Sequence, residues 1–448
     1  MHTAAHVGRS GRWILHKQLS LSEWLIVGAV AAAVAAAAAL GDVGTGTAGA
    51  ARGWESVGPF LDEVRRNGLS LPLLWSPHEE HRLPLPRLLF LLVHGSSPHP
   101  RLGLLLSLLL LAGTYRLLLP LLRSATHSGS SFPAPAPPST VLAVLPALLC
   151  LCFFSLAQLE GLLRADQLAA HLFTLGLVMA LLGIERPLSG RFWLGTALAL
   201  ASSGYWIVLL PLAALQLGLR VLYRRPGRGH RPLSAGEAAA GALRLGLLGG
   251  LLLLYLRHLP TEPLASSLAA AAARPLGTAR ELLVLLGGPF LFTPSLLVGH
   301  GAGDGAAGGP SGFSGLPALL GGLGFLTLFS ALIYNHRKQI KERILPELWL
   351  PLAAIALSAL ICISRAGELT AAEISRYQAF VIFGWIGLLC GVLRSPGLWR
   401  RRALRGMVAL VVVGFVLGSI GGLAALWRGS AHAIGRPGAA AVQSVLTG

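Results

Sequence analysis

The sequence predicts an all-α membrane protein, a polytopic bundle of about eleven helical spans (about 10–13) that occupies residues 1–448 as a single transmembrane domain. Of the 448 residues, 54% are hydrophobic and only 12% are charged. A soluble domain carries roughly twice that charged fraction. The four cysteines all lie in apolar runs. These observations exclude a soluble globular enzyme, a disordered chain and a disulfide scaffold.

Nine stretches approach the roughly 20 residues needed to cross a bilayer core. They are residues 24–41, 102–122, 140–157, 168–184, 237–256, 316–334, 347–363, 378–393 and 407–427. The long apolar run over 192–222, broken at 202–205, is interpreted as two half-length spans, because a single span would export the arginines of 220–231. For the same reason residues 281–299 are expected to be re-entrant or surface-lying, since a full span there would export the basic run 335–343.

The basic residues set the expected orientation. The first span follows Arg9, Arg12 and Lys17, which predicts a cytoplasmic N-terminus. Its alanine-rich core also resembles a signal peptide, but an uncleaved anchor is expected because a polytopic chain follows. Residues 123–139 then form an inner Pro/Ser-rich loop and residues 300–315 a Gly-rich outer loop. The net charge of +18 is explained by basic cytoplasmic loops rather than by nucleic-acid binding.

Acidic residues concentrate on the opposite side. In this topology 13 of the 18 acidic residues lie outside. Carboxylates contribute little to orientation, so their concentration needs another reason. Chemistry on the outer face is the reason that we favour.

The first outer segment, residues 42–101, contains the densest group of polar side chains. Between Trp75 and Arg87, prolines bracket the residues His78, Glu79, Glu80, His81 and Arg82. A carboxylate here could take a proton from an attacking hydroxyl, and Arg and His could neutralise a phosphate leaving group. The histidines are three residues apart rather than four, which excludes an H-E-x-x-H protease motif. A divalent metal held by His78, His81 and a glutamate, or a solvated charged loop, are the alternatives.

Two further outer segments carry polar residues between spans. The first holds Gln158, Glu160 and Gln167, and there a Glu160–Arg164 helix pair is the alternative to a functional role. The second holds Arg365, Arg376 and Tyr377. Arg376 opens an apolar run, where it either snorkels to lipid head groups or binds the phosphate of a lipid-linked substrate.

Three motifs resemble a known group of proteins. The run L-W-S-P-H-E-E-H-R-L-P-L-P-R-L resembles the L-W-x-Q-H-N-E-H-R-I-x-x-P-R-L signature of uncharacterised bacterial polytopic membrane proteins. The runs Q-L-E-G-L-L-R-A-D-Q and S-R-A-G-E-L-T-A-A-E-I-S-R-Y resemble two further segments of those proteins in the same order. Glu79 stands where that signature has Asn, and Pro77 where it has Gln. These proteins are similar in layout to GT-C glycosyltransferases.

The resemblance implies a GT-C-like bundle with short surface helices in the long first outer loop, in a bacterial cytoplasmic membrane. It implies an inverting glycosyltransferase with its site on the outer face, a polyprenyl-phosphate sugar as donor and an envelope glycan or lipid as acceptor. Glu80 takes the place of the motif's glutamate as the base. Asp62 and Glu63 are the alternative acidic pair.

The remaining roles follow from the same resemblance. The donor phosphate would be bound by His78, His81, Arg82, Arg376 and Tyr377. Supporting residues would be Glu79, Gln158, Glu160, Gln167 and Arg365. No cofactor and no nucleic acid are expected. The alternatives are a transporter or lipid flippase, for which Arg244 is the one clear ionisable residue within a span, or a non-catalytic scaffold. The transferase hypothesis requires the first loop and Arg376 to lie close together.

Overall fold

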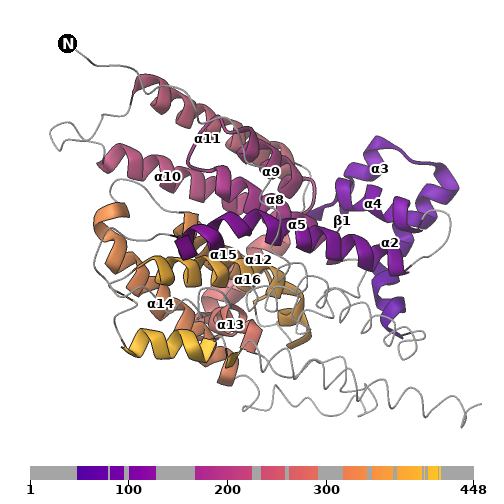
Figure 1. Ribbon diagram of the computed structural model, residues 1–448. Coiled ribbons are helices and arrows are strands. Elements are labelled where there is room, and N and C mark those ends of the chain that lie inside the picture. Colours follow the sequence, from indigo (N-terminus) through magenta and orange to yellow (C-terminus); the bar gives the residue numbers. More distant parts are fainter. Residues whose placement is uncertain are drawn as a thin grey trace, which may run out of the picture.

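The computed structural model describes residues 48–78, 81–94, 100–127, 167–223, 234–257, 262–290, 316–340, 346–366, 371–395, 398, 402–411 and 413–414. Within these ranges the chain is helical apart from connecting turns and one hairpin of two two-residue strands (Figure 1). The predicted all-α class is therefore confirmed. The expected spans at 24–41 and 140–157 lie outside the described residues, and most of 407–427 does too. The count of about eleven spans remains a prediction.

The described elements have the following bounds, in chain order. The first half contains α2 (Ala48–Asn67), α3 (Leu71–Trp75), β1 (Pro77–His78), β2 (His81–Arg82), α4 (Pro84–His94), α5 (Pro100–His127), α8 (Leu168–Gly183) and α9 (Gly190–Leu200). The second half contains η3 (Gly204–Val208), α10 (Leu209–Tyr223), α11 (Ala235–Leu256), α12 (Glu262–Ala273), α13 (Pro275–Leu286), η4 (Gly288–Phe290), α14 (Leu316–Ile340), α15 (Pro346–Ser364) and α16 (Ala371–Arg394).

Five helical segments in the described part of the chain are long and apolar enough to cross a membrane. They are Gly204–Leu222, Ala235–Leu256, Leu316–Arg337, Pro346–Ser364 and Tyr377–Arg394. The last four coincide with spans expected from hydropathy. The helices α5 and α8 contain shorter apolar stretches, Leu105–Leu121 and Leu168–Gly183.

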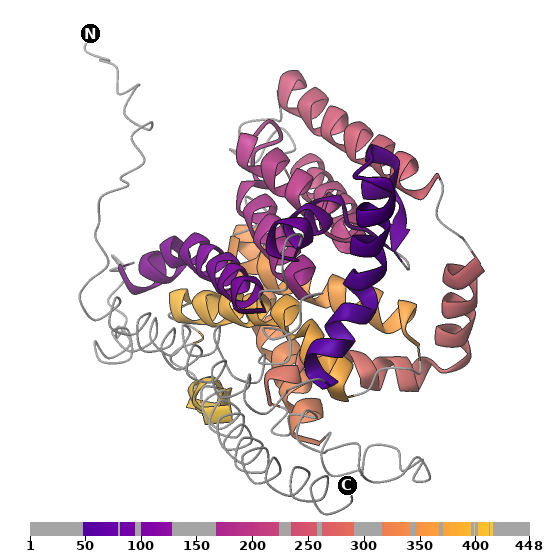
Figure 2. The same cartoon turned by 90° about the vertical axis from the view of Figure 1, so that its right-hand side faces the viewer.

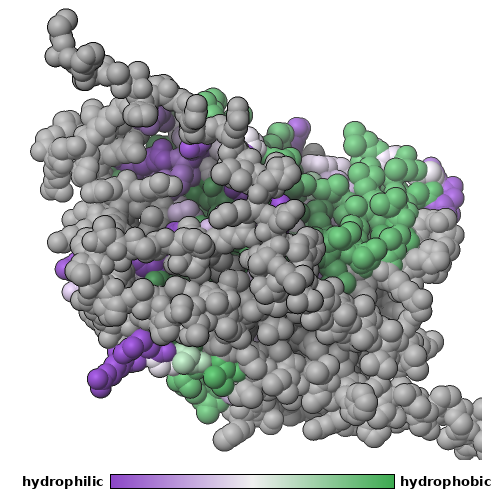
Figure 3. Space-filling model, in the orientation of Figure 1, coloured by the Kyte–Doolittle hydropathy of each residue, from purple (hydrophilic) through white to green (hydrophobic). Residues whose placement is uncertain are grey.

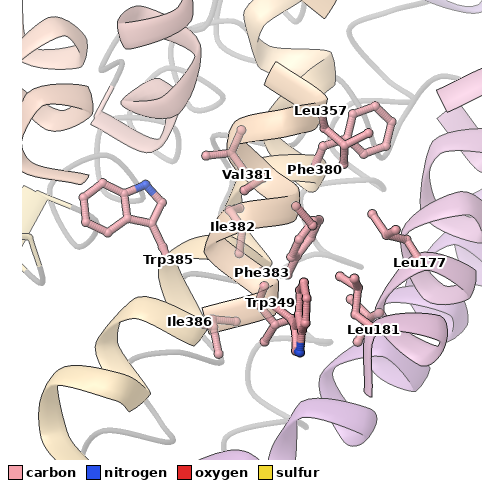
Figure 4. Close-up of a cluster of buried hydrophobic side chains, with 14 of the residues drawn as sticks. Leu177, Leu181, Trp349, Leu357, Phe380, Val381, Ile382, Phe383, Trp385 and Ile386 are labelled. Atoms are coloured by element: carbon pink, nitrogen blue, oxygen red, sulfur yellow. The ribbon is translucent and has the colours of Figure 1, made fainter. Parts of the chain in front are cut away.

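Helix α16 lies at the centre of the bundle (Figure 2). Of its apolar window, 89% is buried, against 22% for that of α11. Phe383 lies on the side of α16 that faces Leu177 and Leu181 of α8, whereas Trp385 lies on the opposite side (Figure 4). The Trp385 indole donates a hydrogen bond to the Leu286 carbonyl of α13 over 2.9 Å. Because α16 packs on both sides, it joins the two halves of the bundle.

The predicted interruption of the run 192–222 is present, but the part that follows it, Gly204–Leu222, is long enough to cross a membrane and is not half-length. Helix α9 ends at Leu200, and the Ser203 hydroxyl accepts a hydrogen bond from the Tyr205 amide where η3 begins. Helix α9 folds back along α8 at very close range, since a Cβ atom on Gly176 would lie 2.7 Å from the Ala199 nitrogen. Such backbone contact is typical of small residues between membrane helices.

The run 281–299, expected to be re-entrant or surface-lying, is interrupted at Gly287. Helix α13 ends at Leu286, and Gly287 lies against the backbone of α14. With only 12 residues, α13 is too short to span a bilayer core. Residues 291–299 lie outside the described ranges.

The segments α2, α3, the hairpin and α4 form an N-terminal unit that packs against α5 and α8 through a small second core. Phe60 and Leu61 of α2 pack with Phe90 of α4 and Leu168 of α8. This unit stands beside the main bundle (Figure 1). It contains the motif that the sequence singles out.

Candidate functional site

The H-E-E-H-R motif forms a two-stranded hairpin. Strands β1 and β2 pair antiparallel, with His78 opposite His81 and Pro77 opposite Arg82. Glu79 and Glu80 fall between the strands and lie outside the described residues, as do the side chains of both histidines. The backbone pairing thus brings the two histidine positions next to each other on either side of the two glutamates.

Arg82 anchors this hairpin to the bundle. Its side chain is only 3% exposed. Its backbone amide donates to the Tyr255 hydroxyl over 2.9 Å, and its Nε donates to the Tyr255 carbonyl over 3.3 Å. Its Nη1 donates to the Trp75 carbonyl over 2.7 Å, and the guanidinium lies 5.9 Å from the Trp75 ring. Of the side-chain nitrogens of Arg82, only Nη2 is buried without a hydrogen-bond partner among the described residues. Arg82 is therefore chiefly a positioning residue.

Arg87 has a similar role that sequence reasoning did not assign. Its Nη1 donates to the carbonyls of Leu73, Leu74 and Ser76 at 2.7 to 3.1 Å. Its guanidinium lies over the Phe60 ring at 5.1 Å. These carbonyls lie at the C-terminal end of α3, where the Leu73 carbonyl also accepts hydrogen bonds from the amide and the hydroxyl of Ser76. Burial lowers the pKa of the Arg87 guanidinium. The two arginines flanking the L-P-L-P run therefore fix the loop that presents the hairpin.

The alternative acidic pair lies on α2. Asp62 is 56% exposed and pairs with Arg65 at 3.4 Å. Glu63 accepts a hydrogen bond from Asn67. Both contacts are local and lie within one helix.

A second group of polar side chains surrounds the C-terminal end of α15. The Tyr205 hydroxyl is hydrogen-bonded with the side chains of Tyr377 and Ser364, and Arg365 lies close enough to interact with it electrostatically. The Tyr205 and Tyr377 rings meet edge to face, 6.3 Å apart. Ser267 of α12 donates to the Ser364 carbonyl over 3.2 Å. We call these five residues the α15 cluster.

Glu281 of α13 adds a carboxylate beside this cluster. It lies close enough to Cys362 to interact electrostatically with the thiol, and Cys362 precedes Arg365 by one turn of α15. One of its oxygens, Oε2, is buried and has no hydrogen-bond partner among the described residues. The sequence gives no signal for this role, because the segment 257–281 contains no recognisable motif.

The hairpin and the α15 cluster are linked through η3. Tyr255, which holds Arg82, packs edge to face against Trp206 at 6.0 Å. Trp206 adjoins Tyr205 of the α15 cluster. Arg82 is therefore connected through Tyr255 to Trp206 of η3, and Tyr377 contacts the adjacent residue of η3, Tyr205. Arg376 immediately precedes Tyr377, but its side chain is outside the described part.

The supporting residues are placed only in part. Gln167 is half-buried at the N-terminal end of α8 and makes no side-chain capping bond. Gln158 and Glu160 lie outside the described residues. Gln378, which sequence reasoning did not assign, is 2% exposed and donates to the Gly288 carbonyl over 2.9 Å. It ties the start of α16 to η4.

Metal ligation is not visible in the described residues, where no group of three or more His, Cys, Asp or Glu side chains could hold an ion. The hairpin tip, with Glu79 and Glu80, lies outside the described residues. The divalent-metal alternative for the motif therefore stays a prediction.

The opposite end of the bundle contains a buried charge network. Arg244 of α11 is 0% exposed. Its Nη1 donates to the Ile184 carbonyl over 2.7 Å, and its Nη2 donates to Gln216 over 2.5 Å. Glu185 accepts from Arg220 and, over 2.9 Å, from the Trp349 indole. This Arg244 network connects the ends of α8, α10 and α15 with the middle of α11.

Comparison with known proteins adds no relative. No family model, no curated protein and no solved structure matches this chain. The resemblance of its motifs therefore remains an expectation from the sequence.

Proposed function

We propose that the chain is a membrane glycosyltransferase that uses a polyprenyl-phosphate sugar on the outer face of a bacterial cytoplasmic membrane, with an envelope glycan or lipid as acceptor. One observation carries the proposal. The hairpin with the H-E-E-H-R motif is connected to the α15 cluster through the contacts of Tyr255, Trp206 and Tyr205. Carboxylates, guanidinium groups and phenols thereby gather at one end of an apolar bundle.

These groups match the needs of an inverting transfer. The acceptor hydroxyl attacks the anomeric carbon, a carboxylate takes its proton, and the bond between that carbon and the phosphate oxygen breaks. The phosphate leaves with the bonding electrons, so its negative charge grows. Glu80, or Asp62 and Glu63, would supply the base in the sequence hypothesis. Glu281 is a further carboxylate beside the α15 cluster.

The departing phosphate needs cations and donors. Arg376 and Tyr377 lie at the start of α16, and His78 and His81 flank the hairpin tip. Arg82 offers only its Nη2. Glu79, Gln158, Glu160, Gln167 and Arg365 are the supporting residues of this proposal. Because a lipid-linked donor carries no nucleotide, no nucleotide-binding domain is required.

The test is transfer of radiolabelled sugar from polyprenyl-phosphate hexose and pentose donors in proteoliposomes. We expect the intact protein to transfer sugar and Glu80→Gln to lose transfer while it inserts normally. Glu63→Gln tests the alternative base, since it removes a candidate carboxylate from the same outer segment. Loss in Glu63→Gln alone would move the base to α2. No transfer by the intact protein with either donor class would contradict the proposal.

A transporter or lipid flippase is the second candidate, and the Arg244 network favours it. Arg244 lies within the candidate span Ala235–Leu256 and is fully buried. Ionisable residues within spans often mark substrate pathways. If this candidate holds, Arg244→Gln abolishes flux of a fluorescent polyprenyl-phosphate analogue across vesicles, whereas Glu80→Gln leaves that flux unchanged.

A further inference from the structure

The N-terminal unit exposes an apolar face. Large hydrophobic side chains that are 39% to 75% exposed occur on α3, on α4 and just before α3: Leu69, Leu71, Trp75, Leu88 and Leu92. Figure 3 shows hydrophobic side chains gathered over this part of the molecule. A large exposed apolar surface of this kind often marks a site that binds a protein or a membrane.

The exposed residues recur at helical spacing. Leu71 and Trp75 are one turn apart on α3, as are Leu88 and Leu92 on α4. The unit's own core uses other residues, among them Phe60 and Phe90. The exposed face is therefore additional to the core and has no cover among the described residues.

The hairpin between α3 and α4 lies level with the end of a membrane span. Arg82 is bonded to Tyr255, and the candidate span that contains Tyr255 ends at Leu256. At this same end of α11, Leu253 is 72% exposed and Leu254 is 63% exposed. Exposed leucines on a span face lipid, so the hairpin is held near the boundary between lipid and water.

Helix α4 cannot itself cross the bilayer. Its 11 residues extend only about 16 Å, whereas the hydrocarbon core is about 30 Å thick. A short apolar helix at this depth is stable when it lies along the interface with its apolar side in the acyl region. Trp75, one turn from Leu71 on α3, belongs to a residue type that is enriched at such boundaries.

We propose that α3 and α4 form a lipid-docking face that rests on the bilayer surface at this end of the bundle, with Leu71, Trp75, Leu88 and Leu92 inserted among phospholipid chains. Arg65 and Arg66, in the last turn of α2, would lie at the level of the lipid phosphates. This inference does not depend on the proposed function, because it concerns the bilayer and not a substrate.

Site-directed spin labelling in phospholipid bilayers tests the proposal on the full chain. With the four cysteines replaced by alanine, labels are placed at Leu71→Cys and Leu92→Cys. Asp62→Cys is the matched control, because Asp62 is also exposed, at 56%, but on α2. Collision with oxygen, which partitions into lipid, is compared with collision with a water-soluble nickel chelate. We expect the ratio of oxygen to nickel collisions to be several-fold higher at 71 and 92 than at 62.

Two results would overturn the proposal. Equally low ratios of oxygen to nickel collisions at all three positions would place the face in water. Low collision with both reagents at 71 and 92 would mean that protein, from a partner or a second copy, covers the face. Leu88→Cys gives an independent reading if one of the first two labels prevents insertion.

Discussion

Arg82 and Arg87 both hold the backbone of the first outer segment. Arg82 bonds two carbonyls 180 residues apart in sequence, at Trp75 and Tyr255, through two different nitrogens, and Arg87 bonds carbonyls at the end of α3 through its Nη1 alone. At Arg82 the planar fork with its five donors is needed, because a lysine ammonium cannot match the same directions. The motif's arginines thus contribute to the site by holding its backbone.

Replacing Arg82 with lysine should destabilise the protein. The variant keeps the charge but loses the Nε and Nη1 hydrogen bonds in a site that is 3% exposed, at a cost of about 2–3 kcal/mol. Thermal unfolding in detergent should show a lower midpoint. Arg65→Lys is the control, because Arg65 is exposed and paired only with Asp62. Equal midpoints for the two variants would show that Arg82 does not anchor the hairpin.

Glu281 allows a prediction at the same scale. If the proposed transfer occurs beside the α15 cluster and Glu281 serves as its base, Glu281→Gln should lower the rate by about 10² to 10⁴, the usual effect of losing general-base catalysis. Its unfolding midpoint should not fall, because one carboxylate oxygen is buried and unpaired and the amide is uncharged. Single-turnover transfer in proteoliposomes measures the rate. An unchanged rate would exclude Glu281 as the base and leave Glu80, Asp62 and Glu63.

At the scale of elements, α8 and α9 show close packing through small residues. A Cβ atom at Gly176 would come within 2.9 Å of Leu198, and one at Gly183 within 2.6 Å of the Phe192 nitrogen. In a membrane the hydrophobic effect gives little drive for helices to associate, so such close contact carries much of the stability.

Gly176→Leu should therefore separate α8 from α9 and lower the unfolding midpoint, since overpacking a tight contact costs about 1–3 kcal/mol or more. Gly246→Leu, in α11, is the matched control because a Cβ atom there meets nothing within 4 Å. Leucine also favours the helix more than glycine does. An unfolding midpoint that falls as far in Gly246→Leu as in Gly176→Leu would show that close contact between α8 and α9 is not the cause.

Sequence reasoning predicts these elements unevenly, for physical reasons. Hydropathy locates α11, α14, α15 and α16, because each must match the thickness of the bilayer. The polar residues at 202–205 locate the break before η3. The partners of Arg82 and Tyr205 are not predictable in this way, since Tyr255 lies 173 residues from Arg82 and no local pattern encodes such a contact. The side chains that gather at the α15 cluster come from four separate elements, and only Arg365 and Tyr377 were expected.

Across the whole molecule, buried polar groups gather at the two ends of the bundle. The α15 cluster occupies one end. The Arg244 network lies toward the other, as do a Glu347–Arg394 ion pair and a 2.5 Å contact between His336 and Ser395. The apolar middle between them is filled by residues such as Phe383 and Leu177 (Figure 4). This distribution suits a protein whose two ends face water and whose centre faces lipid.

The predicted topology places those two ends on opposite sides of the membrane. Cysteines at Leu276, which is 85% exposed, and at Arg337, which is exposed near the end of α14, should report this. A membrane-impermeant maleimide should label Leu276→Cys in intact cells and label Arg337→Cys only after permeabilisation, because basic residues are retained inside. The reverse pattern would invert the topology, and equal labelling would show that the two positions share one side.

The position of α16 has a consequence for how the protein is made. Nearly all of its apolar window is enclosed by protein, yet its residues are synthesised after those of α5, α8, α13, α14 and α15, which enclose it. Until residues 371–394 have emerged from the ribosome, the groove between those earlier helices is not filled by α16. Large residues such as Phe173, Phe325 and Trp349 line this groove. The final bundle closes only when this late helix leaves the insertion machinery and displaces whatever fills the groove. A chain interrupted before that moment exposes the groove, and the cell's quality control can recognise it.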